Sequence, residues 1–253
     1  MTADMRGPEP RQTDHEQRLR DRFTSRPMAV ARFIAQRLLL KPLVWSLTTV
    51  TVVDRDKVKA IDGPFIAVAN HASHLDAPLI MGALPRRHAR YLAAGAAGDY
   101  FFDVRWRRGL TALFFNAFPV DRGARTGRAG RTVKAKSLVE RGVPLLLFPE
   151  GTRSRNGELG PFKPGAAALA AACDVPCVPV ALIGVHLAHP RGANWPKPGR
   201  LPVGVVFGEP MHAHSGENPI EFTARIKAEV VRLRESNAPH ILRQTAATKG
   251  AHP

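Results

Sequence analysis

The sequence predicts a three-layer α/β domain, in which helices cover both faces of a sheet. Two observations support this fold class. Short β-branched or apolar segments alternate along the chain with segments of helical character, which is typical of α/β domains. The chain also has 253 residues, of which 44% are apolar, and this is enough to build one sizeable core.

Five segments have the composition of strands. The first of them is entirely β-branched, and the others are short apolar runs that fit strands buried inside a sheet. These predicted strands are 48–53, 65–69, 144–148, 177–182 and 203–207.

Helical segments lie between the strands and after them. Segment 128–141 is followed by Gly142, a favourable residue just past a helix end, and segment 166–172 is rich in alanine. A last helix is predicted to start at Asn218 as N-cap, with Glu221 completing a capping box. Its apolar stripe consists of Phe222, Ile226, Val230 and Leu233.

The two ends of the chain are predicted to be disordered tails. Residues 1–26 and 237–253 are polar and lack apolar periodicity, so the folded domain is expected to span 27–236. Residues 1–26 also lack the apolar core of a signal peptide, and none is expected. The two cysteines, Cys173 and Cys177, are too few for a disulfide framework and favour a reduced, cytoplasmic setting.

Segment 27–45 is the most apolar part of the chain, yet Arg32, Arg37, Lys41 and Pro42 interrupt it. A membrane-spanning helix is therefore not expected. The segment instead resembles a basic amphipathic helix that lies on the cytoplasmic face of a membrane as a peripheral contact. The alternative is a helix packed against its own domain. The predicted apolar face consists of Met28, Val30, Phe33, Ile34 and Leu38.

The formal net charge of +16 implies an anionic partner. The excess is concentrated in residues 81–141, where thirteen Lys and Arg residues face four acids. An anionic membrane surface, a phosphorylated substrate or nucleic acid would each satisfy this charge. No zinc-finger spacing or P-loop is present in the sequence, so nucleic acid is the least favoured of the three.

The segment that follows the strand 65–69 carries a candidate catalytic pair, His71 and Asp76. In a regular helix a spacing of five would hold the two side chains apart. They can meet if His71 lies in a loop and a helix begins after it, with either Ser73 or Asp76 as its cap. Asp76 would then fix the imidazole tautomer and leave the other ring nitrogen free to accept a proton.

A second candidate segment, 148–154, follows the strand 144–148. Ligands of open α/β sheets bind at such strand ends. Gly151 permits close approach to the backbone, and Arg153 offers a planar fork for phosphate. Glu150 can accept a hydrogen bond from a substrate hydroxyl, and Thr152 can donate or accept one. Two further candidate phosphate ligands are Arg122, beside Gly123, and Lys163.

Taken together, these segments resemble the motifs of the glycerolipid acyltransferases, the family of 1-acylglycerol-3-phosphate acyltransferase. The N-H-x4-D motif is matched by Asn70, His71 and Asp76, and the F-x-x-R pattern loosely by Phe118 and Arg122. The F-P-E-G-T-R-S motif is matched in full at 148–154, and the apolar V-P-V strand at 178–180. The four motifs stand in the family's order across roughly residues 48–210.

The resemblance implies a mixed, mostly parallel sheet flanked by helices. It also implies acyl-CoA or acyl-carrier-protein as the donor and a lysophospholipid, such as lysophosphatidic acid, as the acceptor. His71, oriented by Asp76, would be the general base, and Arg122 and Arg153 would hold the acceptor's phosphate, with Glu150 near the glycerol. Neither a metal nor another cofactor is expected, because a thioester is already activated.

Other functions stay open on the sequence alone. The same chemistry could serve a glycolipid or an amino-acid lipid, since residues outside the motifs shape the acceptor pocket. A lipid-binding protein without catalysis would not need an oriented base, so the His71–Asp76 pair argues against it. A basic nucleic-acid-binding protein would explain the charge but not the ordered motifs.

Overall fold

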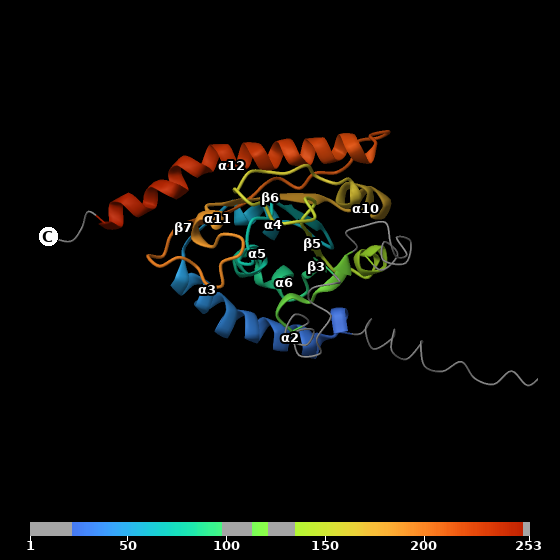
Figure 1. Cartoon of the computed structure of the whole chain (residues 1–253). Coiled ribbons are helices and arrows are strands. Elements are labelled where there is room, and N and C mark those ends of the chain that lie inside the picture. The colour runs from blue at the N-terminus through green and yellow to red at the C-terminus, as the bar shows by residue number, and fades with distance from the viewer. Residues whose placement is uncertain (1–21, 98–112, 121–134, 250–253) are drawn as a thin grey trace, which may run out of the picture.

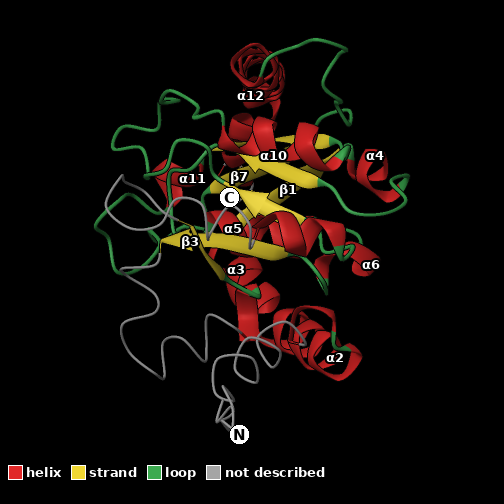
Figure 2. Ribbon diagram, turned by 90° about the vertical axis from the view of Figure 1, so that its right-hand side faces the viewer, coloured by secondary structure: helices red, strands yellow, loops and turns green. Residues whose placement is uncertain are grey.

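The computed structural model describes residues 22–97, 113–120 and 135–249, which form three layers (Figures 1 and 2). A seven-stranded sheet is the middle layer, in the order β1-β7-β6-β2-β5-β3-β4. Only the β6–β7 pair is antiparallel among the strand pairs of the described chain. The predicted fold class, a mixed and mostly parallel sheet flanked by helices, is confirmed.

The five predicted strands are present within a residue or two of their expected ends. Two more, β3 and β4, were not predicted as strands. β3 consists only of alanine and glycine, which have low strand propensity, and it forms because it pairs with β5 and β4. The strands are β1 Thr49–Val53, β2 Ile66–Ala69, β3 Ala93–Ala97, β4 Phe118–Val120, β5 Leu145–Leu147, β6 Cys177–Ile183 and β7 Pro202–Phe207.

Helices cover both faces of the sheet, and alternate residues of the central strands therefore enter different cores. Ala67 and Val180 pack with helices on one face, whereas Val68 packs with helices on the other. The helices are α2 Arg26–Ala35, the π-helical segment η1 Gln36–Leu40, α3 Lys41–Leu47, α4 Arg55–Lys59, α5 Asp76–Ala83, α6 Arg86–Ala89, α10 Gly165–Cys173, α11 Val185–Ala188 and α12 Pro219–Lys249. A short helix also covers 135–140.

Helix α12 starts as predicted and ends later than predicted. Asn218 Oδ1 accepts hydrogen bonds from the backbone N–H of Ile220 and Glu221, and Glu221 Oε2 accepts one from the N–H of Asn218. The expected tail 237–253 is wrong up to Lys249, because the helix continues to that residue. Ile241 extends the apolar stripe by two turns and packs, fully buried, where Gly204 leaves room on β7.

The first tail is also shorter than predicted. Residues 22–24 are helical, and Phe23 is buried in the core beside the sheet. Arg22 donates a hydrogen bond to the carbonyl of Ala117. A single aromatic residue in a charged segment gives no periodic signal, so the sequence did not reveal this contact. Residues 1–21 lie outside the described residues.

The segment 27–45 forms a continuous helical rod, α2–η1–α3, along the outer edge of one layer (Figure 1). Its polar residues face the domain: Arg32 is only 1% exposed, and Gln36 is buried as well. Six of its large apolar residues are exposed and form what we call the outer apolar face, whereas Val44 is buried and Leu40 and Trp45 pack against the core. This face consists of Met28, Val30, Ile34, Leu38, Leu39 and Leu43. Phe33, which was predicted for the apolar face, is half-buried. Within the described ranges, no helix combines the length and apolarity that crossing a bilayer requires.

Candidate active site

The site is built where β2 ends. Asn70, the residue after the strand, is buried and completes the pairing of β2 with β6 through its side chain. Its Oδ1 accepts a hydrogen bond from the N–H of Leu182 at 2.7 Å, and its Nδ2 donates to the Leu182 carbonyl at 3.0 Å. This bidentate contact fixes the point at which the chain leaves the sheet and turns into the loop that carries His71.

The predicted contact between His71 and Asp76 is present. His71 Nδ1 lies 2.7 Å from Asp76 Oδ2, with the carboxylate fully buried and the imidazole 19% exposed. Because a carboxylate only accepts hydrogen bonds, the Nδ1–H donates to it, and Nε2 keeps a free lone pair. The pair therefore has the arrangement of a general base held in one tautomer by an acid.

The loop between these two residues is wrapped around the same carboxylate oxygen. The backbone N–H groups of Ala72 and Ser73 donate to Asp76 Oδ2 at 2.6 and 2.8 Å. Helix α5 begins at Asp76, as required for the pair to meet, and Leu75 holds the N-cap position in place of Ser73 or Asp76. Pro78 is then in the first helical turn, where its missing N–H costs nothing.

Two residues of the F-P-E-G-T-R-S motif, Phe148 and Glu150, also contact His71. The ring of His71 stacks on Phe148, with centroids 4.1 Å apart and planes 19° from parallel. Glu150 Oε1 accepts a hydrogen bond from the N–H of His71 at 2.8 Å, and its Oε2 accepts one from Gly160 at 3.0 Å. Burial raises the pKa of Glu150, while these two N–H donors oppose that shift.

The loop after β5 lies directly over the loop of His71. Ser154 N–H donates to the carbonyl of His71 at 2.8 Å. Gly151 has a φ of +72°, and a Cβ at this position would stand 3.0 Å from Nζ of Lys163. Glycine thus serves both the turn and the close approach of the ammonium group. Lys163 is anchored by its own N–H, which donates to the Pro149 carbonyl at 3.0 Å.

Arg153 supplies positive charge to the same region. Desolvation by the surrounding loops, followed by the charges of Arg153 and His189, lowers the pKa of His74 to about 4. His74 is therefore neutral near pH 7. The structure thus gathers the predicted residues His71, Asp76, Glu150, Gly151 and Arg153, with Lys163 and the exposed Thr152, at the carboxyl ends of β2 and β5.

Two contacts in the site were not predicted from the sequence. Ser73 Oγ lies 2.8 Å from Nδ1 of His189, and both side chains are buried. His189 follows α11, 116 positions along the chain from Ser73, so no local pattern could link them. The stacking residue Phe148 was noted only as part of a motif, although it supports one face of the base.

One predicted phosphate ligand is not among the residues that the structure describes. Arg122 lies outside the described residues, which end here with β4 at Val120. β4 runs parallel to β3, and β3 runs parallel to β5, so β4 ends at the same edge of the sheet as β2 and β5.

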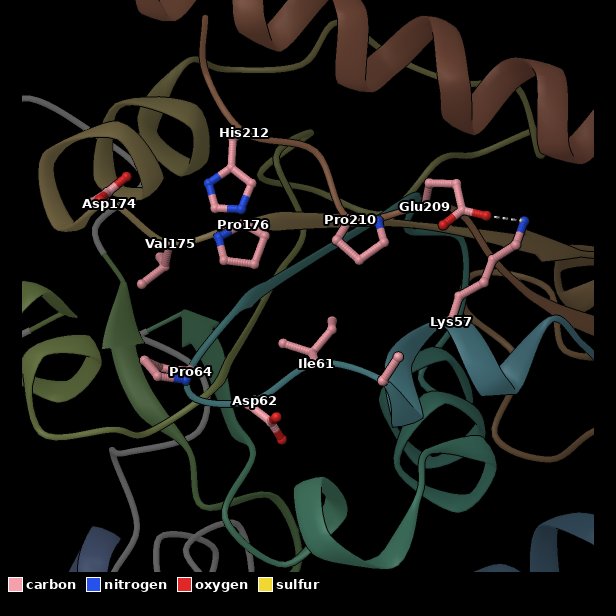
Figure 3. Close-up of a pocket in the computed structure, with 11 residues that line it drawn as sticks. Lys57, Ile61, Asp62, Pro64, Asp174, Val175, Pro176, Glu209, Pro210 and His212 are labelled. Carbon is pink, nitrogen blue, oxygen red and sulfur yellow. Dashed lines mark ion pairs between the residues drawn. The ribbon is translucent and has the colours of Figure 1, made fainter.

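A solvent-open cavity of about 480 Å³ lies at the opposite edge of the sheet (Figure 3). It is lined by Pro64 and Pro176, which precede β2 and β6, and by the Lys57–Glu209 ion pair at 3.2 Å. Asp62 and Asp174 add negative charge. This cavity is separate from the site around His71, because it lies where β2 and β6 begin, whereas His71 follows the end of β2. Its negative charge also does not suit a phosphorylated substrate.

Comparisons with known proteins agree with this architecture. The family model described as Acyltransferase matches residues 49–183. A 1-acyl-sn-glycerol-3-phosphate acyltransferase of Limnanthes douglasii is 34% identical over 151 residues, which cover 58% of this chain and 50% of the relative. The alpha form of the same enzyme from Mus musculus is 34% identical over 151 residues, covering 56% and 49%.

One solved structure has a similar fold. It is the 1-acyl-sn-glycerophosphate (LPA) acyltransferase PlsC of Thermotoga maritima, with a TM-score of 0.61 and 24% identity. The alignment covers 88% of this chain and 89% of that one. Fold and site define an α/β protein with an oriented histidine base, and the family match covers more than half of the chain. The chain belongs to the Acyltransferase family. It spans about half the length of the curated relatives it matches.

Proposed function

We propose that this protein transfers a fatty acyl chain from acyl-CoA or acyl-carrier-protein to the free hydroxyl of lysophosphatidic acid or a related lysophospholipid. The product with lysophosphatidic acid is phosphatidic acid. The observation that carries the proposal is the His71 Nδ1 to Asp76 Oδ2 contact of 2.7 Å, which leaves Nε2 as a free base at a strand end. The names of the relatives support the choice of acceptor.

The chemistry follows from that geometry. His71 Nε2 accepts the proton of the acceptor hydroxyl while the hydroxyl oxygen attacks the carbonyl carbon of the thioester. The tetrahedral intermediate then collapses with cleavage of the carbon–sulfur bond. The imidazolium returns its proton to the departing thiolate, so the free thiol and the new ester leave an unchanged enzyme. Asp76 stabilises the imidazolium between the two proton transfers.

Phosphate recognition is assigned to the cationic groups beside the base. Arg153 offers a planar fork and Lys163 a point charge above Gly151, so both attract a phosphate monoester. Arg122 is proposed as a third ligand on its motif alone. Thr152 is exposed beside them and can bond a phosphate or hydroxyl oxygen.

Glu150 acts mainly by holding the site together in this proposal. Both of its carboxylate oxygens already accept backbone hydrogen bonds, from His71 and from Gly160. It thereby ties the loop of the base to the loop of the phosphate ligands. A direct contact with the acceptor's glycerol would have to share these oxygens.

The protein is also proposed to work as a peripheral protein on the cytoplasmic face of a membrane. The proposed substrate and product are both membrane lipids, and the outer apolar face of α2–η1–α3 has no protein contact among the described residues that would cover it. Scattered apolar residues are normal on a protein surface, but six on one helical rod are typical of an interfacial helix.

The decisive experiment replaces the base. In His71→Ala, thiol release from an acyl-CoA in the presence of lysophosphatidic acid should fall by about 10²–10⁴-fold. His212→Ala is the matched control, because this exposed histidine lies at the opposite edge of the sheet (Figure 3). Unchanged turnover in His71→Ala would refute the assigned base.

The acceptor is tested separately. Arg153→Ala and Lys163→Ala should raise the KM for lysophosphatidic acid while the KM for acyl-CoA stays the same. A change in the acyl-CoA KM alone would contradict the phosphate assignment. A screen of lysophospholipid, glycolipid and amino-acid lipid acceptors at one acyl-CoA concentration, read by mass spectrometry, then identifies the acceptor.

A further inference from the structure

The loop between α11 and β7, residues 190–200, exposes an indole ring to solvent. Trp195 is 70% exposed, the largest exposed fraction of any aromatic residue in the described chain. Leu187 on the adjoining helix α11 is exposed as well. Tryptophan is seldom left this open, since burying its ring would remove a large apolar area from water.

The loop lies between the end of the α2–η1–α3 rod and the active site. At one end, Arg200 Nη2 donates to the carbonyl of Trp45 in α3 at 3.1 Å. At the other end, Arg191 Nη1 donates to the carbonyl of Arg153 at 3.0 Å. Figure 1 shows the loop, in orange, reaching toward the end of α3. One end of loop 190–200 therefore contacts the rod, and the other end contacts segment 148–154, which carries Arg153.

The charge of the loop has one sign. Arg191, Lys197 and Arg200 are all exposed, and segment 190–200 contains no acidic residue. An aromatic ring flanked by cations is the composition found where proteins meet an anionic membrane surface. The ring suits the boundary between headgroups and acyl chains, and the cations suit the lipid phosphates.

We infer that loop 190–200 is a second membrane contact, which places Trp195 at the headgroup level of an anionic bilayer. The inference rests on the membrane part of the proposed function and extends it. If the rod were the sole membrane contact, the domain could still rotate about the long axis of the rod. A second contact on the side of the active site fixes that rotation, so the edge that carries His71 and Arg153 faces the lipid surface from which the acceptor comes.

The test measures binding of the full chain to vesicles of phosphatidylcholine alone and of phosphatidylcholine mixed with phosphatidylglycerol. Trp195→Ser should weaken binding to the mixed vesicles by about tenfold, since one large apolar side chain is lost from the interface. Lys197→Gln should weaken it by about fivefold on mixed vesicles only. Ile220→Ser is the matched control: Ile220 is 72% exposed, but it lies on α12, on the other side of the sheet (Figure 1).

A second readout reports insertion directly. Brominated lipids quench tryptophan fluorescence on contact, and the chain has three tryptophans. In Trp195→Phe, brominated lipids should quench a smaller part of the tryptophan fluorescence than in the unchanged protein. This variant keeps an aromatic ring and should therefore keep most of its affinity for vesicles. Equal thermal unfolding of the variants and the unchanged protein establishes that the loop change did not alter the fold.

The outcomes separate this inference from the proposed function. If Trp195→Ser binds like the unchanged protein while Leu38→Ser weakens binding, the loop contact is refuted and the role of the rod stands. If the unchanged protein binds neither vesicle, both membrane contacts are refuted, and acyl transfer with a soluble short-chain acceptor remains as a separate test of the chemistry. Equal losses in Trp195→Ser and Ile220→Ser would also refute the loop contact.

Discussion

Helix α12 and the α2–η1–α3 rod lie on opposite sides of the same sheet (Figure 2). The two helices differ in the side chains that they bury and expose. α12 buries Phe222, Ile226 and Val230, as an ordinary amphipathic helix of a water-soluble domain does. The rod buries Arg32 and Gln36 beside Val44, and it exposes Leu38, Leu39 and Leu43. The outer side of α12 is mostly polar, whereas the outer side of the rod carries six exposed apolar side chains.

The contacts of the two helices differ accordingly. α12 is held by packing against β6 and β7, where Val230 and Ile241 join a core cluster. The rod is held by two kinds of contact: Val44 joins the core and Leu40 and Trp45 pack against it, while polar side chains donate to backbone carbonyls. Arg32 reaches Arg90 at 2.9 Å, Gln36 reaches Phe114 at 2.6 Å, and Lys41 reaches Gly82 at 3.2 Å. The comparison teaches that apolar residues do not mark the inner face of every helix.

Truncation of the α12 stripe should have the largest effect. Phe222→Ala removes a buried ring and leaves a cavity, so the free energy of unfolding should fall by about 3–5 kcal/mol in urea denaturation. Ile220→Ala, on the exposed side of the same turn, should change it by less than about 0.5 kcal/mol. Similar values for the two variants would contradict the assigned inner face.

Loss of a polar anchor of the rod should have an intermediate effect. Arg32→Ala removes a buried side chain and its partly buried hydrogen bond to the Arg90 carbonyl, and we expect a loss of about 1–3 kcal/mol in the free energy of unfolding. Burial, and then the charge of Arg22, lowers the pKa of Arg32 to about 10, so the side chain remains charged at pH 7. A stabilised Arg32→Ala variant would show that burying the guanidinium costs more than its hydrogen bonds return.

The N-cap of α12 should contribute less. Asn218→Ala removes the acceptor for two backbone N–H groups, with an expected loss of about 1 kcal/mol measured by thermal or urea unfolding. Asn218→Ser keeps a capping oxygen and should be close to neutral. If Asn218→Ala and Asn218→Ser lost the same free energy of unfolding, the capping hydrogen bonds would not be the cause of that loss.

Changes on the outer apolar face should affect stability least. Leu38→Ser and Leu39→Ser alter exposed side chains, 68% and 62% accessible, and each should change the free energy of unfolding by less than about 0.5 kcal/mol. The same changes should weaken vesicle sedimentation, because they remove the apolar area offered to lipid. A large loss of stability would mean that these leucines pack on the domain.

Much of the active site was predictable because its parts are close in the sequence. His71 and Asp76 are five residues apart, and a loop followed by a helix start at Asp76 is enough to bring them together. The Asn218 cap is local in the same way. The five strands followed from composition, whereas β3 did not, since only its pairing partners make a strand of alanine and glycine.

Contacts between distant segments could be found only in the tertiary structure. The Asn70–Leu182 and Ser73–His189 hydrogen bonds join segments more than 100 residues apart, so no local sequence pattern predicts them. Likewise, burial of Ile241 turned an expected tail into helix. By itself the sequence determined the dyad, the Asn218 cap and the division of the 27–45 helix into a polar and an apolar face, but not the N-cap of α5. Which face turns inward was decided by the tertiary fold, because the carbonyls of Arg90, Phe114 and Gly82 stand where Arg32, Gln36 and Lys41 can reach them.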